Sequence, residues 1–299
     1  MKRGKGKVNR EIYGLYFVLP FFLAMLLFRL VPMVYTGILS FTDWDGFARQ
    51  LNFVGFANYR RLLTDDPLFY RSLFNTFLLW FLHVWPRMGV ALLCAVLFAQ
   101  TRIRGGQFFK AVFYFPNLVT ASSVAVLAML ILNTRMGFLN QFLMAANIIR
   151  EPINWLGVPG NARGVVAFLT WWMWFGHSTI LLTSGILGIP GDVIESALVD
   201  GANAWQRFWR ITMPLLRPTF AFVFTMSLIG GLQNFDIPHV LNNLGDPSRA
   251  ILTTVMQMFN MAFHARQFGY GSAYAIALFI VILVVSLFVF KVVNRPEEE

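Results

Sequence analysis

Long apolar runs dominate this chain of 299 residues and constrain its fold more than any other feature. Hydrophobic residues make up 57% of the sequence and charged residues 13%, whereas charged residues form about a quarter of an ordinary soluble domain. A helix needs about 20 mainly apolar residues to cross a bilayer. We expect six such spans, at about 12–39, 72–99, 108–132, 164–187, 215–234 and 272–292.

The apolar runs favour helices over membrane strands. They are continuous and rich in Leu, Phe, Val and Ala, whereas spanning strands are segments of about ten residues with alternating polarity. We therefore expect an all-α, polytopic membrane protein with one transmembrane domain over residues 1–299. The net charge of +10 does not require a nucleic-acid partner, because Lys and Arg collect beside membrane spans. Cys94 is the only cysteine, so neither a disulfide framework nor a cysteine metal site is expected.

The basic residues beside the spans indicate the orientation of the chain. More Lys and Arg residues flank the segments on the side of the N-terminus than those on the opposite side, and cytoplasmic loops carry this excess. An even number of spans brings both ends to the same side. We therefore expect both termini in the cytoplasm, together with the polar segment at 190–214 between the fourth and fifth spans.

The segment at 190–214 shows the start and bend signals of two short helices. Asp192 and Glu195 have the spacing of an N-cap and its partner three residues later. Gly201 predicts a sharp bend, because glycine adopts a positive φ at little cost. Asn203 and Gln206 repeat the capping-box spacing. The segment is therefore predicted to form two short helices joined by a turn.

Nine residues of this segment have the order and spacing of a known loop: Glu195, Ser196, Ala197, Asp200, Gly201, Ala202, Phe208, Ile211 and Pro214. Further motifs stand at 40–44, 54–59, 75–76, 234–236 and 268–273. Together they resemble the carbohydrate branch of the binding-protein-dependent ABC importer permeases, in which the loop is called the EAA loop. The resemblance extends over nearly the whole chain.

The resemblance implies the type I ABC importer permease fold, with six transmembrane helices and a cytoplasmic coupling-helix loop. It implies a permease subunit that imports a sugar or oligosaccharide across the plasma membrane of a bacterium or archaeon and is not itself an enzyme. The implied partners are a second homologous permease, two copies of an ABC ATPase and an extracytoplasmic solute-binding protein. ATP and Mg²⁺ are expected in the ATPase, with no cofactor in this chain, whose sequence has no GxxxxGK[ST] loop.

A different interpretation of the loop is an amphipathic segment in the lipid headgroup region without a protein partner. Such interfacial helices usually carry Lys and Arg on the polar face. The first predicted helix of this loop is acidic instead, which favours the docking interpretation.

A sugar path needs hydrogen-bonding groups and aromatic faces inside the spans. In the fifth span, four small or polar residues recur at i, i+3, i+4 and i+7, on one face of a helix. With neighbours that the resemblance adds, the candidates are Ser227, Gly230, Gly231, Gln233, Asn234, Trp172 and His177. The alternatives are close helix packing for the glycines and an outward position near lipid for the tryptophan.

Arg87 places a charge within the second span, where we expect it to face the bundle or a water-filled gap. Its partner cannot be identified from the sequence. The main alternative function is an ion-coupled secondary transporter of a small polar solute, which would need carboxylates along the spans, and their interiors contain none. A membrane enzyme or scaffold is a third class, and the sequence contains neither an HExxH nor a GxSxG motif.

Overall fold

The computed structural model describes residues 10–100, 104–242 and 247–293. Within these ranges the chain forms helices, and its only β-pairing is an isolated antiparallel bridge between Thr42 and Phe53, so the predicted all-α class is confirmed. The described residues divide into two compact units. The first unit lies within 1–65 and 260–277, and the second lies within 66–259 and 278–299.

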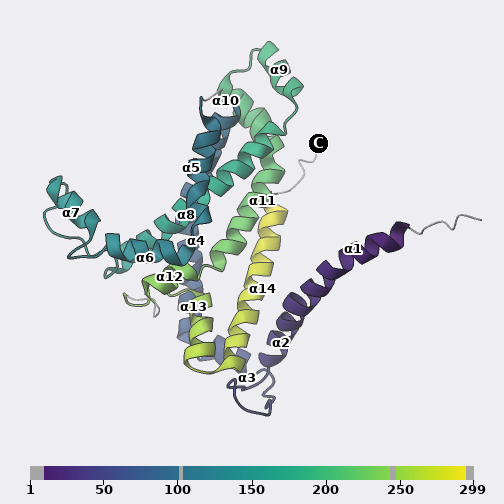
Figure 1. Cartoon of the computed structure of the whole chain (residues 1–299), viewed down its shortest axis with the longest axis vertical. Helices are drawn as coiled ribbons and strands as arrows, with labels where there is room; N and C mark the ends of the chain where they lie inside the picture. Colours follow the sequence, from purple (N-terminus) through teal and green to yellow (C-terminus); the bar gives the residue numbers. More distant parts are fainter. Residues whose placement is uncertain (1–9, 101–103, 243–246, 294–299) are drawn as a thin grey trace, which may run out of the picture. The chain divides into compact units, whose positions relative to one another are not determined.

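The first unit begins with one long apolar helical segment (Figure 1). It consists of α1 (Arg10–Met25), a π-helical turn (Leu26–Leu30) and α2 (Val31–Leu39), and residues Tyr16–Leu39 are long and apolar enough to span a membrane. The unit continues with α3 (Ala57–Thr64), a π-helical turn (Asn260–His264) and the start of α14 (Phe268–Val293).

Three sequence motifs meet in the first unit, those at 40–44, 54–59 and 268–273. The side-chain amide Nδ2 of Asn58 donates hydrogen bonds to the carbonyls of Ser40 (2.9 Å) and Thr42 (2.7 Å). The backbone N–H of Gly269 donates to the carbonyl of Trp44 at 3.0 Å. A Cβ atom on Gly269 would collide with the carbonyl oxygen of Thr42, so only glycine permits this approach. These motifs therefore fix the loop after α2 against the start of α14.

The second unit holds most of the helices. They are α4 (Pro67–Gln100), α5 (Gly106–Leu118), α6 (Ala121–Ile131), α7 (Phe138–Ala145), α8 (Pro159–Leu187), α9 (Gly191–Val199), α10 (Ala204–Arg207), α11 (Met213–Leu232), α12 (Asp236–Leu241), α13 (Thr254–Phe259) and the remainder of α14, with a π-helical turn at Phe208–Thr212. Over the described residues of the chain, five helices are long and apolar enough to span a membrane, and they match the first, second, fourth, fifth and sixth predicted spans.

The third predicted span, 108–132, differs from a single helix. It consists of α5 and α6, which meet at an angle of 90°. The chain bends because Val119 and Thr120, three and four residues after Pro116, both adopt extended backbone angles. The Thr120 hydroxyl then accepts a hydrogen bond from the N–H of Ser123 and caps the start of α6. The span is therefore broken at a defined point.

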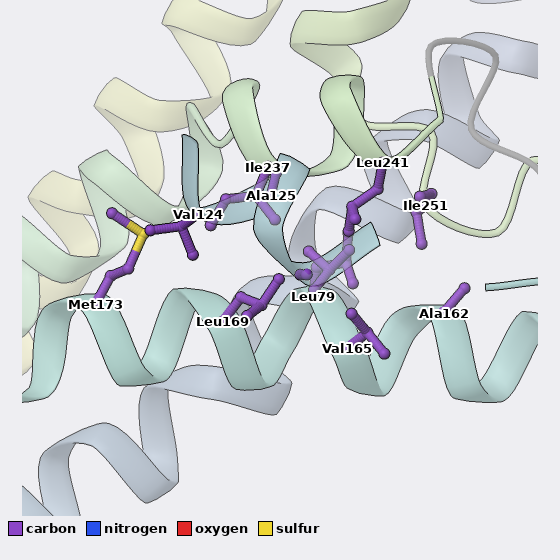
Figure 2. Packing of buried hydrophobic residues seen from close by; sticks show 12 residues of the cluster. Leu79, Val124, Ala125, Ala162, Val165, Leu169, Met173, Ile237, Leu241 and Ile251 are labelled. Atoms are coloured by element: carbon purple, nitrogen blue, oxygen red, sulfur yellow. The ribbon is translucent and has the colours of Figure 1, made fainter. Parts of the chain in front are cut away.

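The helix α8 lies at the centre of the packing in the second unit. On one side its residues Ala162 to Met173 pack with Leu79 of α4, Val124 of α6 and Ile237 of α12 (Figure 2). Closer to its C-terminus, Leu182 packs with residues of α4 and α11. Between membrane helices such contacts act through close van der Waals packing, since lipid tails are themselves apolar. Helices α4, α8 and α11 thus form one tightly packed group.

Replacing Gly269 with Ala should destabilise the first unit by about 1–3 kcal/mol, as overpacking does. The added methyl group would meet the backbone oxygen of Thr42, which cannot rotate away as a side chain can. Thermal melting of the purified protein in detergent measures the loss. Gly37→Ala is the matched control, because nothing lies within 4 Å of a Cβ built there. Equal melting temperatures for the wild type and Gly269→Ala would contradict this packing.

Candidate functional site

The first helix of the polar segment, α9, begins one residue before the predicted N-cap. Its N-cap is Pro190, without a side-chain cap, so the predicted Asp192 cap is wrong. Asp192 lies instead in the first turn, where a carboxylate is stabilised by the positive end of the helix dipole. The Ser196 hydroxyl donates to the Asp192 carbonyl at 2.8 Å. Glu195 remains exposed on the surface of the helix.

The bend after α9 is at Gly201, as predicted. Its φ is +78°, in the left-handed region that favours glycine. The N–H of Ala202 donates to the carbonyl of Ala197 at 2.9 Å, and the N–H of Asp200 donates to that of Ser196 at 3.0 Å. These bonds end the helix in the manner of a glycine C-cap and reverse the chain within a few residues.

The second helix starts with the predicted capping box, which is confirmed. The N–H of Gln206 donates to Asn203 Oδ1 at 2.8 Å, and the N–H of Asn203 donates to Gln206 Oε1 at 2.9 Å. Through the π-helical turn, which contains Phe208 and Ile211, the chain then runs directly into α11. Pro214 is the second residue of α11, directly after the π-helical turn, where its ring removes one backbone N–H donor from the continuous helical segment.

Apolar side chains of this segment are exposed beside its carboxylates. Val199 is 89% exposed and Trp205 is 71% exposed, and Leu198 and Trp209 are exposed as well. With Glu195 they form what we call the loop surface. Within the second unit, the loop surface lies at the end opposite α12 and α13 (Figure 1). Exposed aromatic and apolar groups next to charges are typical of a protein-docking surface.

A cavity of about 370 Å³ lies among α4, the α5–α6 bend, α8 and α11. We call it the α4–α8–α11 cavity. The residues that bring polar or aromatic groups to it, together with two glycines, are His83, Arg87, Asn117, Thr170, Trp174, His177, Gly230, Gly231, Gln233, Asn234, Phe235 and Asp236. Its volume lies in the range of small-molecule sites.

Arg87 lies deep in this cavity and is 6% exposed, so the prediction that it faces the bundle is confirmed. Its Nε donates to Ser178 Oγ of α8 at 2.8 Å, and its Nη1 donates to Ser227 Oγ of α11 at 3.1 Å. The guanidinium carbon stands 5.6 Å from the centre of the Trp174 ring. Ser227 therefore holds Arg87 and does not itself line the cavity.

The two glycines of the predicted stripe have different roles. A Cβ on Gly231 would collide with Trp80 and stand 3.2 Å from His83 Nε2, so this residue permits close packing of α11 against α4. Nothing lies within 4 Å of a Cβ on Gly230, which borders open space in the cavity. Gly231 therefore permits close helix packing, whereas Gly230 borders the cavity and its place on a sugar path stays a prediction.

Gln233 and Asn234 line the cavity although α11 ends at Leu232. The predicted helical face thus stops before its fourth member. Asn234 Nδ2 donates to Thr170 Oγ1 of α8 at 3.2 Å, which links the end of α11 to α8. Asp236 follows in the first turn of α12 and is exposed at the rim of the cavity.

In α8, His177 lines the cavity but Trp172 does not. Trp172 lines a separate groove, formed mainly by apolar residues of α6 and α8. Trp174 lines the cavity in its place, because residues two apart on a helix point about 200° away from each other. The His177 ring stacks on Tyr114 of α5 at 6.3 Å and meets Trp174 edge-on at 5.7 Å.

Sequence reasoning did not find His83 and Asn117 as cavity residues. His83 is one helical turn before Arg87, so the spacing i, i+4 was the available signal. Asn117 lines the cavity only because the helix ends at Leu118, and the position of that bend had no clear signal in the sequence.

The chain thus combines helices that are long and apolar enough to span a membrane, a cavity lined by both apolar and polar side chains, and an exposed segment between two of the lining helices. The family model described as "Binding-protein-dependent transport system inner membrane component" matches residues 12–296. The chain belongs to this family, and it is therefore a multi-pass membrane permease of an ABC transporter rather than an ion-coupled secondary transporter.

Individual relatives agree with this assignment. The chain is 30% identical to the probable ABC transporter permease protein YesP of Bacillus subtilis over 97% of this chain and 93% of the relative. It is 31% identical to the arabinooligosaccharides transport system permease protein AraP of the same species, over 92% and 86% of the two chains. A chain of a bacterial alginate ABC transporter, solved in complex with an alginate pentasaccharide-bound periplasmic protein, has the same fold, with a TM-score of 0.80, 23% identity and 96% coverage of both chains.

Gly231→Ala should destabilise the protein by about 1–3 kcal/mol through the collision with Trp80. Gly230→Ala is the matched control on the neighbouring position, and it should be neutral or stabilising by up to about 1 kcal/mol, since alanine favours a helix over glycine. Melting temperatures in detergent compare the two. Equal destabilisation by both variants would contradict the assignment of one glycine to packing and the other to open space.

Proposed function

We propose that this chain is the permease subunit of an ATP-driven importer for a sugar or oligosaccharide, which takes its substrate from an extracytoplasmic binding protein. The observation that carries the substrate class is the lining of the α4–α8–α11 cavity. The amides of Gln233 and Asn234 and the imidazole of His177 offer donors and acceptors for sugar hydroxyls. The indole of Trp174 offers an aromatic surface for a sugar ring. The name of AraP, which refers to arabinooligosaccharides, supports the same class.

In this proposal the loop surface is the coupling surface that docks on the ATPase subunit. Glu195 offers a carboxylate for charge-assisted hydrogen bonds, and the exposed Leu198 and Trp205 offer apolar groups for hollows in the partner. The other predicted residues of the segment shape the loop: Ser196, Ala197, Asp200, Gly201, Ala202, Phe208, Ile211 and Pro214. Movement of the ATPase then reaches the cavity through the ends of α8 and α11.

The assembled importer contains a second homologous permease, two copies of the ATPase and the binding protein. ATP and Mg²⁺ bind to the ATPase, and this chain needs no cofactor of its own. The loop surface and both termini lie in the cytoplasm. ATP-driven closure of the ATPases turns the cavity outward, sugar enters from the binding protein, and reopening releases it to the cytoplasm.

Reconstitution of the assembled complex in proteoliposomes tests this function. We expect uptake of labelled sugar that needs both ATP and the binding protein, with arabino- and galacto-oligosaccharides as first probes. Vanadate, which traps the ATPase, should stop the uptake. Uptake driven by a pH or sodium gradient in the absence of ATP would overturn the proposal.

Substitutions at Gly201 test the coupling role of the bend. Gly201→Val should lower sugar uptake about tenfold or more, because a β-branched residue is strongly disfavoured at a φ of +78°. Gly201→Asn is the matched control, since asparagine tolerates this conformation and should keep most of the uptake. Equal uptake by both variants, at equal amounts of complex in the membrane, would contradict the role of the bend.

Substitutions at Glu195 test the contact itself. Glu195→Lys reverses the charge at the proposed dock and should reduce both sugar-stimulated ATP hydrolysis and uptake, while basal hydrolysis by the ATPase persists. A charge reversal on the exposed rim of an interface typically weakens association through electrostatic repulsion. Unchanged stimulation and unchanged uptake in Glu195→Lys would contradict the docking of this helix.

A further inference from the structure

Arg87 carries a buried positive charge that its partners in the described chain do not neutralise. The partners of its guanidinium are the hydroxyls of Ser178 and Ser227 and the face of Trp174. Hydroxyls satisfy N–H groups but supply no negative charge. A buried charge without an opposite charge is costly, so a site that keeps one at 6% exposure is suited to a ligand that brings the opposite charge.

Arg87 lies within the membrane span and lines the cavity, so an opposite charge could reach it from a ligand in the cavity. It lies about 30 Å along α4 from Pro67 and about 18 Å from Ala99, at 1.5 Å per residue, so it is inside the span. Its two serine partners come from α8 and α11 and point its guanidinium between these helices, where it lines the cavity. A charged group within a span is a candidate for function by its position alone.

A second group in the same cavity also lacks a partner. His83 is 1% exposed, and neither of its ring nitrogens has a hydrogen-bond partner in the described structure. It lines the cavity one helical turn before Arg87. His177 Nδ1 is likewise buried without a partner. Buried polar groups are normally hydrogen-bonded, so these unpaired nitrogens are a second unsatisfied feature of the residues that line the cavity.

The remaining charged features of the cavity fit an anionic ligand. The only carboxylate that lines it within the described residues is that of Asp236, which is exposed at the rim and forms no ion pair with Arg87. The first residue of α6, Ala121, also lines the cavity, so the positive end of that helix borders it. Apart from Asp236, the charges that border the cavity are thus positive.

We infer that the α4–α8–α11 cavity binds saccharides that carry a carboxylate, such as uronic acids, and that Arg87 is the residue that selects them. A guanidinium fork matches the geometry of a carboxylate. The carboxylate group that meets the guanidinium carries a single negative charge, whereas a phosphate monoester concentrates a charge of about −1.5 to −2 on one group. The inference deepens the proposed function and rests on it, since it assumes that this cavity is the sugar path.

Uptake of three labelled probes by the reconstituted complex tests this inference. The probes are digalacturonate, its neutral counterpart galactobiose, and galactose 1-phosphate. Arg87→Gln should lower digalacturonate uptake about tenfold or more, as loss of a hydrogen bond to a charged group does, and should leave galactobiose uptake unchanged or higher. Because the same binding protein delivers the probes in every variant, the change in their ratio belongs to the permease.

Two further variants keep the result independent of folding. Arg87→Lys keeps the charge but loses the fork, so the ratio of digalacturonate to galactobiose uptake should fall less than in Arg87→Gln. Asp236→Asn removes the opposite charge from the rim and should not lower the ratio. An equal fall for both sugars in Arg87→Gln, at normal complex levels, would show a structural role only and would overturn the inference.

Other outcomes separate this inference from the proposed function. ATP-dependent uptake of galactobiose without any uptake of digalacturonate, or a preference for galactose 1-phosphate, would overturn the carboxylate class and leave the importer function intact. Uptake that needs an ion gradient and not ATP would overturn the proposed function. The effect of Arg87→Gln on the probe ratio would still decide whether this residue selects anionic sugars.

Discussion

The hydrogen bonds from Arg87 to two serines are the interaction on which the centre of the second unit depends. They tie α4 to α8 and α11 inside the span, where no bulk water can solvate a charge. An apolar side chain at this position would avoid the cost of burying a charge but would remove the buried positive charge from the cavity. The buried guanidinium therefore holds three helices in a fixed arrangement and places a charge between them.

The same helices connect the cavity to the loop surface. Helix α8 contributes Trp174 and His177 to the cavity and ends at Leu187, a few residues before α9. Helix α11 begins directly after the second helix and its π-helical turn, and contributes Gly230 to the cavity. A displacement of the segment at 190–214 can thus be transmitted to the cavity through two helices, α8 and α11. The contact of Asn234 with Thr170 links these two helices again beside the cavity.

Much of this arrangement could be predicted from the sequence, because local signals determine it. The helical spans follow from apolar length, the bend at Gly201 from its need for a positive φ, and the start of α10 from the Asn203 capping box. The side chains that share the cavity could not be predicted in this way. Whether Trp172 or Trp174 faces inward depends on how α8 is rotated against its neighbours, and the partners of Arg87 come from helices about 90 and 140 residues away in the chain. The 90° bend in the third span depends on two extended residues whose sequence, Val119-Thr120, is compatible with a helix as well.

In the proposed function, ATP-driven movement of the loop surface changes the side from which the cavity is open. A single cysteine at Gly230, in a variant in which Cys94 is replaced by Ala, measures this directly, since nothing lies within 4 Å of a side chain there. In the reconstituted complex, a membrane-impermeant thiol reagent should reach this cysteine from the outside when vanadate traps the ATPase with the binding protein bound, and from the cytoplasmic side in the resting state. Reaction from one side only, unaffected by ATP, vanadate or the binding protein, would contradict the account.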